Sequence, residues 1–250
     1  MAECKIGRGA DSDRKSSYLL TVDSDVNELF YTSMLLQRFE YNSCTETKGT
    51  DAFDMAIAAS PSLIITELDL SDMPGLELIQ RLKNDVRTAS IPVIVKSVGL
   101  TPELERHYRS AGVAAFVHSP VLAEDLFHAV QNTIETTPRS NIRIHTRLPV
   151  IINGKALECT QGECVSELSE FGMFVRTLQG CPLNTLVSVQ FTVKDRSLSA
   201  EAQVLYCRHF GQVSFKEPGV AFKFLHLDPS DRVYIRAYIE EELMKGIIRK

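Results

Sequence analysis

The sequence predicts two domains: an α/β doubly wound five-stranded parallel sheet, followed by a small antiparallel β-barrel with a C-terminal helix. In the first half, short continuous apolar runs alternate with helical periodicity, which is typical of a parallel sheet covered on both faces. In the second half, strand-like runs follow one another with turn residues between them. A chain of 250 residues, 44% of them hydrophobic, has the size of two globular domains.

The first domain is expected over residues 17–135, after a disordered tail at 1–16. Its apolar strand segments are Tyr18–Val22, Leu63–Thr66, Ile91–Val95 and Ala114–Val117. Helical segments are expected after Val26, at Ala52–Ala59, after Leu76, at Pro102–Ala111 and at Val121–Ile134. On the first helix, Val26, Leu29, Phe30, Ser33 and Leu36 are expected to share one face. Parallel sheets place their sites beyond the carboxyl ends of the strands.

A linker is expected at residues 136–141, and the β-barrel domain at 142–250. Its expected strands are Ile142–Ile152, Ala156–Cys159, Cys164–Leu168, Met173–Thr177, Leu186–Thr192, Ser197–Tyr206 and Val213–Phe224. Pro229 suits the first turn of a last helix, because its fixed φ and missing N–H fit that position. On that helix a stripe of Ile235, Ile239 and Leu243 should dock on the sheet.

Composition and charge exclude several function classes. A net charge of −5 lacks the basic excess of a nucleic-acid-binding protein, so no nucleic acid polymer is expected as partner. The six cysteines form no CxxC pair, which argues against a zinc site and fits a reducing cytoplasm. No apolar run is long enough to span a membrane. No nucleophile–base pair or glycine-rich phosphate loop is visible, so we expect no catalytic residue, no metal and no covalent cofactor.

A buried strand at Leu63–Thr66 runs into an acidic loop and then into a helix after Met73-Pro74-Gly75. This layout resembles the receiver domain of response regulators, which is phosphorylated on an aspartate at the end of that strand. The resemblance implies that Glu67 occupies the acceptor position, where its carboxylate is one methylene longer. Asp69 would project elsewhere.

The other receiver positions are only partly kept. The family has two adjacent acids after the first strand, and here these positions read Asp23 and Ser24, with Asp25 as a substitute one residue into the helix. Ser97 keeps the hydroxyl that senses phosphate. The lysine expected before the last strand's proline is replaced in the segment His118-Ser119-Pro120.

Phosphoryl transfer to a carboxylate needs Mg²⁺ held by oxygen ligands and a cation that balances the developing charge. One metal acid and the lysine are missing, so the sequence predicts neither Mg²⁺ binding nor phosphorylation. Glu67 is read either as a silent relic or as a permanently charged mimic of the acceptor. Asp23 is read as a helix N-cap or remnant rather than a metal ligand, and His118 as an exposed loop residue.

Two short motifs mark the second domain. The first is an RxxxR segment, Arg139-Ser140-Asn141-Ile142-Arg143. The second is the turn Glu167-Leu168-Ser169-Glu170-Phe171-Gly172. Together they resemble the PilZ domain, a receptor for cyclic di-GMP, whose second motif is [D/N]xSxxG. The resemblance implies ligand contacts from Arg139, Arg143, Glu167, Ser169 and Gly172. Arg143 and Arg147 also fit the RxxxR spacing, so the arginine pair stays open.

These residue types suit the ligand's chemistry. Guanidinium groups bind phosphodiesters in bidentate fashion and stack on guanine, and a carboxylate with a hydroxyl can accept a guanine's N–H groups. The glycine would let the backbone approach the purine, or turn where φ is positive. Glu167 replaces the family's Asp or Asn, and a strained base contact would cost about 1–3 kcal/mol. Binding of cyclic di-GMP therefore remains open.

The sequence thus predicts a non-enzymatic, cytoplasmic adaptor or receptor in motility, polarity or surface behaviour. Its barrel would bind cyclic di-GMP, and its receiver-like domain would contact an unidentified protein partner. The alternative is a nucleotide-independent scaffold in which both ligand sites are degenerate. Receiver domains often pair through their fourth and fifth helical faces, which leaves a homodimer open.

Overall fold

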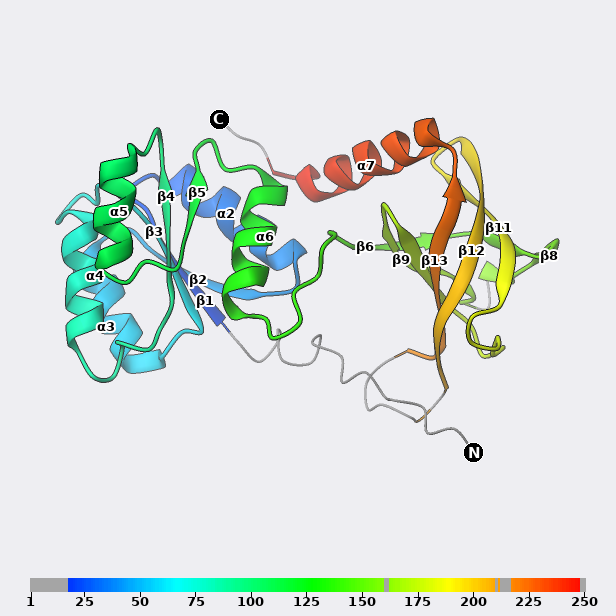
Figure 1. Cartoon of the computed structure of the whole chain (residues 1–250), viewed down its shortest axis with the longest axis horizontal. Coiled ribbons are helices and arrows are strands. Elements are labelled where there is room, and N and C mark those ends of the chain that lie inside the picture. The colour runs from blue at the N-terminus through cyan, green and yellow to red at the C-terminus, as the bar shows by residue number, and fades with distance from the viewer. Residues whose placement is uncertain (1–17, 160–161, 210, 212–216, 248–250) are drawn as a thin grey trace. The chain divides into compact units, whose positions relative to one another are not determined.

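The computed structural model describes residues 18–159, 162–209, 211 and 217–247 (Figure 1). The tail predicted at 1–16 lies outside the described residues, as does the start of the strand predicted at Val213–Phe224. The chain divides into two compact units after Ser140, and the second unit ends at Lys245. Each unit is described by itself.

The first unit is a five-stranded parallel sheet in the order β2-β1-β3-β4-β5. Its strands are β1 (Tyr18–Val22), β2 (Asn42–Glu46), β3 (Leu63–Glu67), β4 (Val93–Ser97) and β5 (Ala115–His118). Its helices are α2 (Val26–Arg38), α3 (Gly49–Ala59), α4 (Gly75–Asn84), α5 (Pro102–Ser110) and α6 (Ala123–Ile134). Figure 1 shows α3, α4 and α5 on one face of the sheet and α2 and α6 on the other. The predicted doubly wound fold is confirmed.

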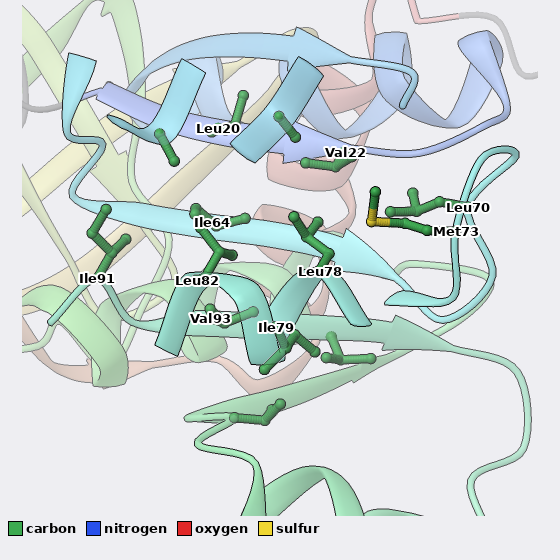
Figure 2. Packing of buried hydrophobic residues seen from close by; sticks show 14 of the residues in the cluster. Leu20, Val22, Ile64, Leu70, Met73, Leu78, Ile79, Leu82, Ile91 and Val93 are labelled. Atoms are coloured by element: carbon green, nitrogen blue, oxygen red, sulfur yellow. The ribbon is translucent and has the colours of Figure 1, made fainter. Parts of the chain in front are cut away.

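The core of this unit lies between the sheet and α3–α4. Ile64 on β3 and Leu78 and Leu82 on α4 are fully buried. Figure 2 shows these side chains meeting beneath Leu20 and Val22 of β1. Burying each such side chain contributes about 1.5–3 kcal/mol, so this layer fixes the strand ends firmly.

Two expectations for the first unit were incomplete. The edge strand β2 was not among the predicted apolar runs, because its residues are polar and mostly exposed. The predicted inner face of α2 was partly wrong: Val26 is 66% exposed and Phe30 50% exposed, whereas Tyr31 and Leu35 are buried. The helix is therefore rotated relative to the expected stripe.

The second unit is an antiparallel curled sheet of eight strands followed by a helix, as predicted. The strand order is β6-β9-β10-β13-β12-β11-β7-β8. The first four strands are β6 (Ile144–Leu148), β7 (Val150–Ile152), β8 (Lys155–Ala156) and β9 (Cys164–Ser169). The others are β10 (Gly172–Arg176), β11 (Leu186–Val193), β12 (Arg196–Arg208) and β13 (Gly219–Leu227).

The single strand expected at Ile142–Ile152 is two strands, β6 and β7, interrupted at Pro149. Proline cannot donate to a strand ladder, so the pairing breaks there. β6 ends the sheet order on one side and β7 lies near the other end. The strand expected at Ala156–Cys159 is also shorter, because β8 ends at Ala156.

The last helix, α7 (Pro229–Met244), begins as predicted. The Asp228 side chain caps it by accepting a hydrogen bond from the Ser230 N–H, and Pro229 occupies the first turn. Its buried residues are Ile235, Ile239 and Leu243, the predicted stripe.

Candidate functional site

Three charged side chains lie in one row at the carboxyl edge of the parallel sheet. Glu67 on β3 pairs with Lys96 on β4, and Asp23 follows the β1 residue that pairs with the β3 residue before Glu67. Side chains at one level of a parallel sheet project to the same face. The register therefore brings Asp23, Glu67 and Lys96 together, and the sequence interpretation had not singled out Lys96.

The Lys96 ammonium donates a short hydrogen bond to Asp23 Oδ2. Both side chains are buried, with 2% of the Lys96 side chain and 6% of the Asp23 side chain exposed. Removing two charges from water costs several kcal/mol per ion. Their mutual attraction offsets this cost only when the geometry is good and the remaining polar groups are hydrogen-bonded. The expectation that the pocket had lost its counter-charge was thus wrong in one respect: a cation is present, contributed by β4 rather than by the β5 loop.

The remaining acids of the pocket are held by backbone groups. Glu67 Oε1 accepts a hydrogen bond of 2.6 Å from the Ser24 N–H. Asp23 Oδ1 accepts one of 2.8 Å from the Asp25 N–H. The N-cap of α2 is Asp25, not Asp23, and its side chain accepts from the Asn27 N–H. Asp25 is therefore committed to the helix terminus rather than replacing the second metal acid.

Two other predicted positions differ in environment. Ser97 is 4% exposed, and among the described residues its hydroxyl has no hydrogen-bond partner. A buried unpaired hydroxyl costs about 1–3 kcal/mol, and the described residues Tyr18, Thr21 and Thr32 share this condition with Ser97. His118 is exposed, but it is the last residue of β5 and pairs with Ser97, so it lies in a strand rather than in a loop.

The residues of this pocket do not fit Mg²⁺. The ion requires octahedral oxygen ligands, usually including one or two carboxylates. Of the two carboxylates in the row, Asp23 already carries the Lys96 ammonium, and Glu67 accepts from a backbone N–H. In the part of the chain that the structure describes, no group of three His, Cys, Asp or Glu side chains could hold a metal.

The Asp72 side chain lies in the loop before α4 but caps the start of helix α3. Its carboxylate accepts hydrogen bonds from the N–H groups of Gly49 and Thr50 and from the Thr50 hydroxyl, at 2.8–3.0 Å. Desolvation raises the pKa of Asp72, but these hydrogen bonds outweigh it and lower the pKa to about 2. The acidic loop therefore caps α3, whose own N-cap, Lys48, makes no side-chain hydrogen bond.

The serine–glycine turn joins β9 to β10 in the second unit. Ser169 pairs with Gly172 across the hairpin, and its hydroxyl donates to the Gly172 carbonyl at 3.0 Å. A Cβ on Gly172 would lie 2.3 Å from the carbonyl oxygen of Phe222 on β13. The glycine is thus required by close backbone packing, and its φ is not positive.

Arg143 and Glu167 face each other beside this turn. Arg143 Nη1 lies 3.6 Å from Glu167 Oε2, and Glu167 pairs with His145 in the β6–β9 ladder. Arg147 points elsewhere, since its guanidinium donates to the Cys159 carbonyl at 3.4 Å. Arg139 belongs to the first unit, where its N–H donates to Gln131 Oε1 at 2.8 Å. Of these three arginines, Arg143 is therefore the one whose guanidinium contacts a residue of the ExSxxG motif.

The hairpin loop is tied to α7. Glu170 accepts two hydrogen bonds from Arg236, at 3.0 and 2.6 Å. The Arg232 guanidinium lies 4.9 Å from the centre of the Phe171 ring, within the range of a cation–π interaction. Two independent contacts thus connect the turn to the C-terminal helix.

Each half of the chain matches a known protein family. Residues 19–131 match the response regulator receiver domain, and residues 137–241 match the PilZ domain. The chain is a receiver domain followed by a PilZ domain. Receiver and PilZ domains are typically non-enzymatic signalling domains, and PilZ domains bind cyclic di-GMP as a ligand. This combination supports a signalling adaptor of the cyclic di-GMP class.

The receiver half has curated relatives. It is 27% identical over 105 residues to the polar-differentiation response regulator DivK of Brucella ovis, covering 42% of this chain and 85% of that protein. It is 26% identical over 129 residues to histidine kinase P4 of Formosa agariphila, covering 50% of this chain and 9% of that protein.

Two solved structures that are similar to this half are described as response regulators. The chemotaxis response regulator CheY4 of Vibrio cholerae is 21% identical with a TM-score of 0.45, covering 47% of this chain and 98% of that one. A putative response regulator from Chloroflexus aurantiacus is 19% identical with a TM-score of 0.46, covering 47% and 97%. In the described part of the protein, no helix has the length and apolar character needed to cross a bilayer.

Proposed function

We propose that this protein is a cytoplasmic, non-enzymatic adaptor whose PilZ domain binds cyclic di-GMP and whose receiver domain, without phosphorylation, contacts a protein partner. The proposed domain boundaries are 17–135 and 142–250, joined by a linker at 136–141. The position of Arg143 beside the Ser169–Gly172 turn carries the ligand assignment. The Arg143 guanidinium would supply the phosphate donor, and the Glu167 carboxylate 3.6 Å from it a guanine acceptor, next to the Ser169 hydroxyl on the same strand as Glu167.

Calorimetry of the full chain with cyclic di-GMP tests the ligand assignment. The wild type should bind, and a variant with Arg139→Ala and Arg143→Ala should lose binding. Lys155→Ala is the matched control, because this cationic side chain lies on β8 at the far end of the sheet order and pairs with Gln179. Absence of heat and of thermal stabilisation in the wild type, at ligand concentrations far above micromolar, would reject the assignment.

The Lys96–Asp23 pair supports a receiver that is not phosphorylated. Any metal at Asp23 would have to displace a buried ammonium, and the Glu67 carboxylate is held by the Ser24 N–H. The test is incubation with acetyl phosphate and Mg²⁺, followed by mass spectrometry of the intact protein. No added phosphate is expected. A stable phosphorylated species at Glu67 or Asp69 would contradict the proposal.

The proposed partner contact and pathway rest on two observations about the receiver domain. A receiver domain without phosphorylation can still act through its surface, and α2 exposes two large apolar side chains, Val26 and Phe30. DivK, to which the receiver half is similar, is a polar-differentiation regulator, which supports a role in motility or polarity. Loss of polar localisation or motility control in a deletion strain, restored by the wild type but not by Phe30→Asp, is the expected result.

One observation favours a second candidate, a nucleotide-independent scaffold. The Arg143–Glu167 contact already pairs the guanidinium that the ligand's phosphate would need. In a scaffold, the double arginine variant would retain full function in the cell. In a receptor, that variant would lose the response to cyclic di-GMP while keeping its fold.

A further inference from the structure

Two cysteines of the PilZ domain stand side by side on neighbouring segments. Cys181 lies in the segment that leads into β11, and Cys207 lies near the end of β12. Cys207 Sγ is 2.7 Å from the carbonyl oxygen of Cys181 and 3.4 Å from its backbone nitrogen. The sulfur of one cysteine therefore rests against the backbone of the other.

Backbone pairing explains why they meet. β11 and β12 are antiparallel neighbours, and the ladder continues before β11: the Asn184 N–H donates to the Val204 carbonyl at 2.9 Å, and the Val204 N–H donates to Thr185 at 3.0 Å. Three residues further along each segment are Cys181 and Cys207. Beyond them, a Cβ on Gly180 would lie 3.3 Å from the His209 ring, so the two segments remain together.

We propose that Cys181 and Cys207 form a reversible disulfide when the protein meets an oxidant of the peroxide class. Because the Cys207 sulfur lies against the Cys181 backbone, a side-chain rotation can bring the two sulfurs to the separation that a disulfide needs. Both thiols are free and partly exposed, so a small oxidant can reach them. Burial, and then the nearby Cys207 sulfur, raise the pKa of Cys181, so its oxidation should be faster at alkaline pH, where more thiolate is present.

The reaction balances with one peroxide. A thiolate attacks the peroxide, whose O–O bond breaks, and the resulting sulfenic acid is attacked by the second thiol. Two S–H bonds are lost and one S–S bond forms. The two electrons and two protons leave with the oxygens as two molecules of water. A dithiol reductant reverses the reaction.

Three other cysteines are described, and one of them, Cys159, is partly exposed like the proposed pair. Cys44 is exposed on the edge strand β2 of the other unit. Cys164 is buried, with its sulfur 3.7 Å from Arg176 Nη2. The disulfide would tie the end of β12 to the segment entering β11, independently of whether the domain binds cyclic di-GMP.

The experiment treats the full chain with hydrogen peroxide, blocks the remaining thiols and digests the protein without reductant. Mass spectrometry should find the Cys181 and Cys207 peptides joined, with the mass of both less two hydrogens, and a reductant should separate them. The joined peptide should be absent from C181S and C207S and present in C44S. Recovery of both peptides only as unlinked, blocked or over-oxidised species would overturn the proposal, as would a preferred bond between any other pair.

Thermal unfolding provides a second measurement. Oxidation should raise the unfolding midpoint of the wild-type PilZ domain by roughly 5 °C or more, because the bond restricts the unfolded chain. The same treatment should leave the midpoint of C207S unchanged. An equal rise in both proteins would also contradict the proposal.

Discussion

Arg143 Nη1 lies 3.6 Å from Glu167 Oε2, so the arginine before β6 already has a carboxylate partner. The exposed fractions of these side chains are 40% and 23%. An ion pair this open to solvent is worth little, and a phosphodiester can compete for the guanidinium. At the proposed ligand site, the Arg143–Glu167 contact should therefore weaken cyclic di-GMP binding without preventing it.

Replacing Glu167 by Asn should tighten cyclic di-GMP binding about tenfold, because the change releases Arg143 and relieves the strained base contact. Calorimetry on the full chain measures this change. Glu201→Asn, on an exposed β12 residue paired with His226, is the matched control and should leave the affinity unchanged. Weaker binding by Glu167→Asn would mean that the glutamate contacts the ligand without strain and that its charge favours binding.

The arginine pair is resolved by single substitutions. Arg143→Ala should weaken binding about 10- to 100-fold, the loss of a charge-assisted hydrogen bond. Arg139→Ala should have a similar effect and Arg147→Ala almost none, because Arg147 is turned toward the Cys159 carbonyl. The reverse order for Arg139 and Arg147 would assign the alternative pair.

Replacing Lys96 by Met should destabilise the receiver domain by about 3–5 kcal/mol, because the buried Asp23 carboxylate loses its partner. Urea unfolding followed by circular dichroism measures the loss. Combining Lys96→Met with Asp23→Leu should recover most of it, since an apolar pair avoids the cost of burying charge. Arg106→Ala is the control: its partner Glu103 is 75% exposed, and the change should stay within about 0.5 kcal/mol. A single variant as stable as the wild type would disprove the buried pair.

Asp72→Ala should cost about 1 kcal/mol at neutral pH through loss of the cap on α3. The pKa of Asp72 is about 2 in the folded protein, below its ordinary 3.8, so its contribution is present above the ordinary value and is lost as the pH falls toward 2. The stability difference between wild type and variant should therefore shrink across that range. Asp54→Ala, at an exposed position within α3, should show no such convergence.

Gly172→Ala should destabilise the PilZ domain by about 1–3 kcal/mol, because the new Cβ meets the Phe222 carbonyl oxygen. Displacement of the turn should also weaken cyclic di-GMP binding. Gly154→Ala separates this clash from ordinary glycine effects: its φ is +79° and no atom lies within 4 Å of the added carbon. Its cost of about 1–2 kcal/mol should come without any loss of affinity.

Most of the fold was predictable because apolar periodicity follows burial. The strand at Leu63–Glu67 and the stripe on α7 were recognisable for that reason. β2 was not predicted because an edge strand of polar residues lacks an apolar pattern. The path of the chain through Pro149, from one end of the sheet order toward the other, depends on long-range pairing that no local window contains.

The candidate sites were predictable only in part. The motif positions around Ser169 and Glu67 followed from the resemblance to receiver and PilZ domains, but Lys96 lies just beyond the expected strand Ile91–Val95 and was not considered. A lysine beside Val95 in a buried strand is itself a signal, since an ammonium is rarely buried without a partner. Its partner, Asp23, is 73 residues away, so the pair became apparent only from the sheet register.

Because Glu170 and Phe171 both contact α7, the loop between β9 and β10 and the last helix are expected to move together. A nucleotide that shifts the loop must either break both attachments or carry the helix along. A partner protein that binds the exposed surface of α7 would then respond to nucleotide binding at the β9–β10 turn without contacting the nucleotide.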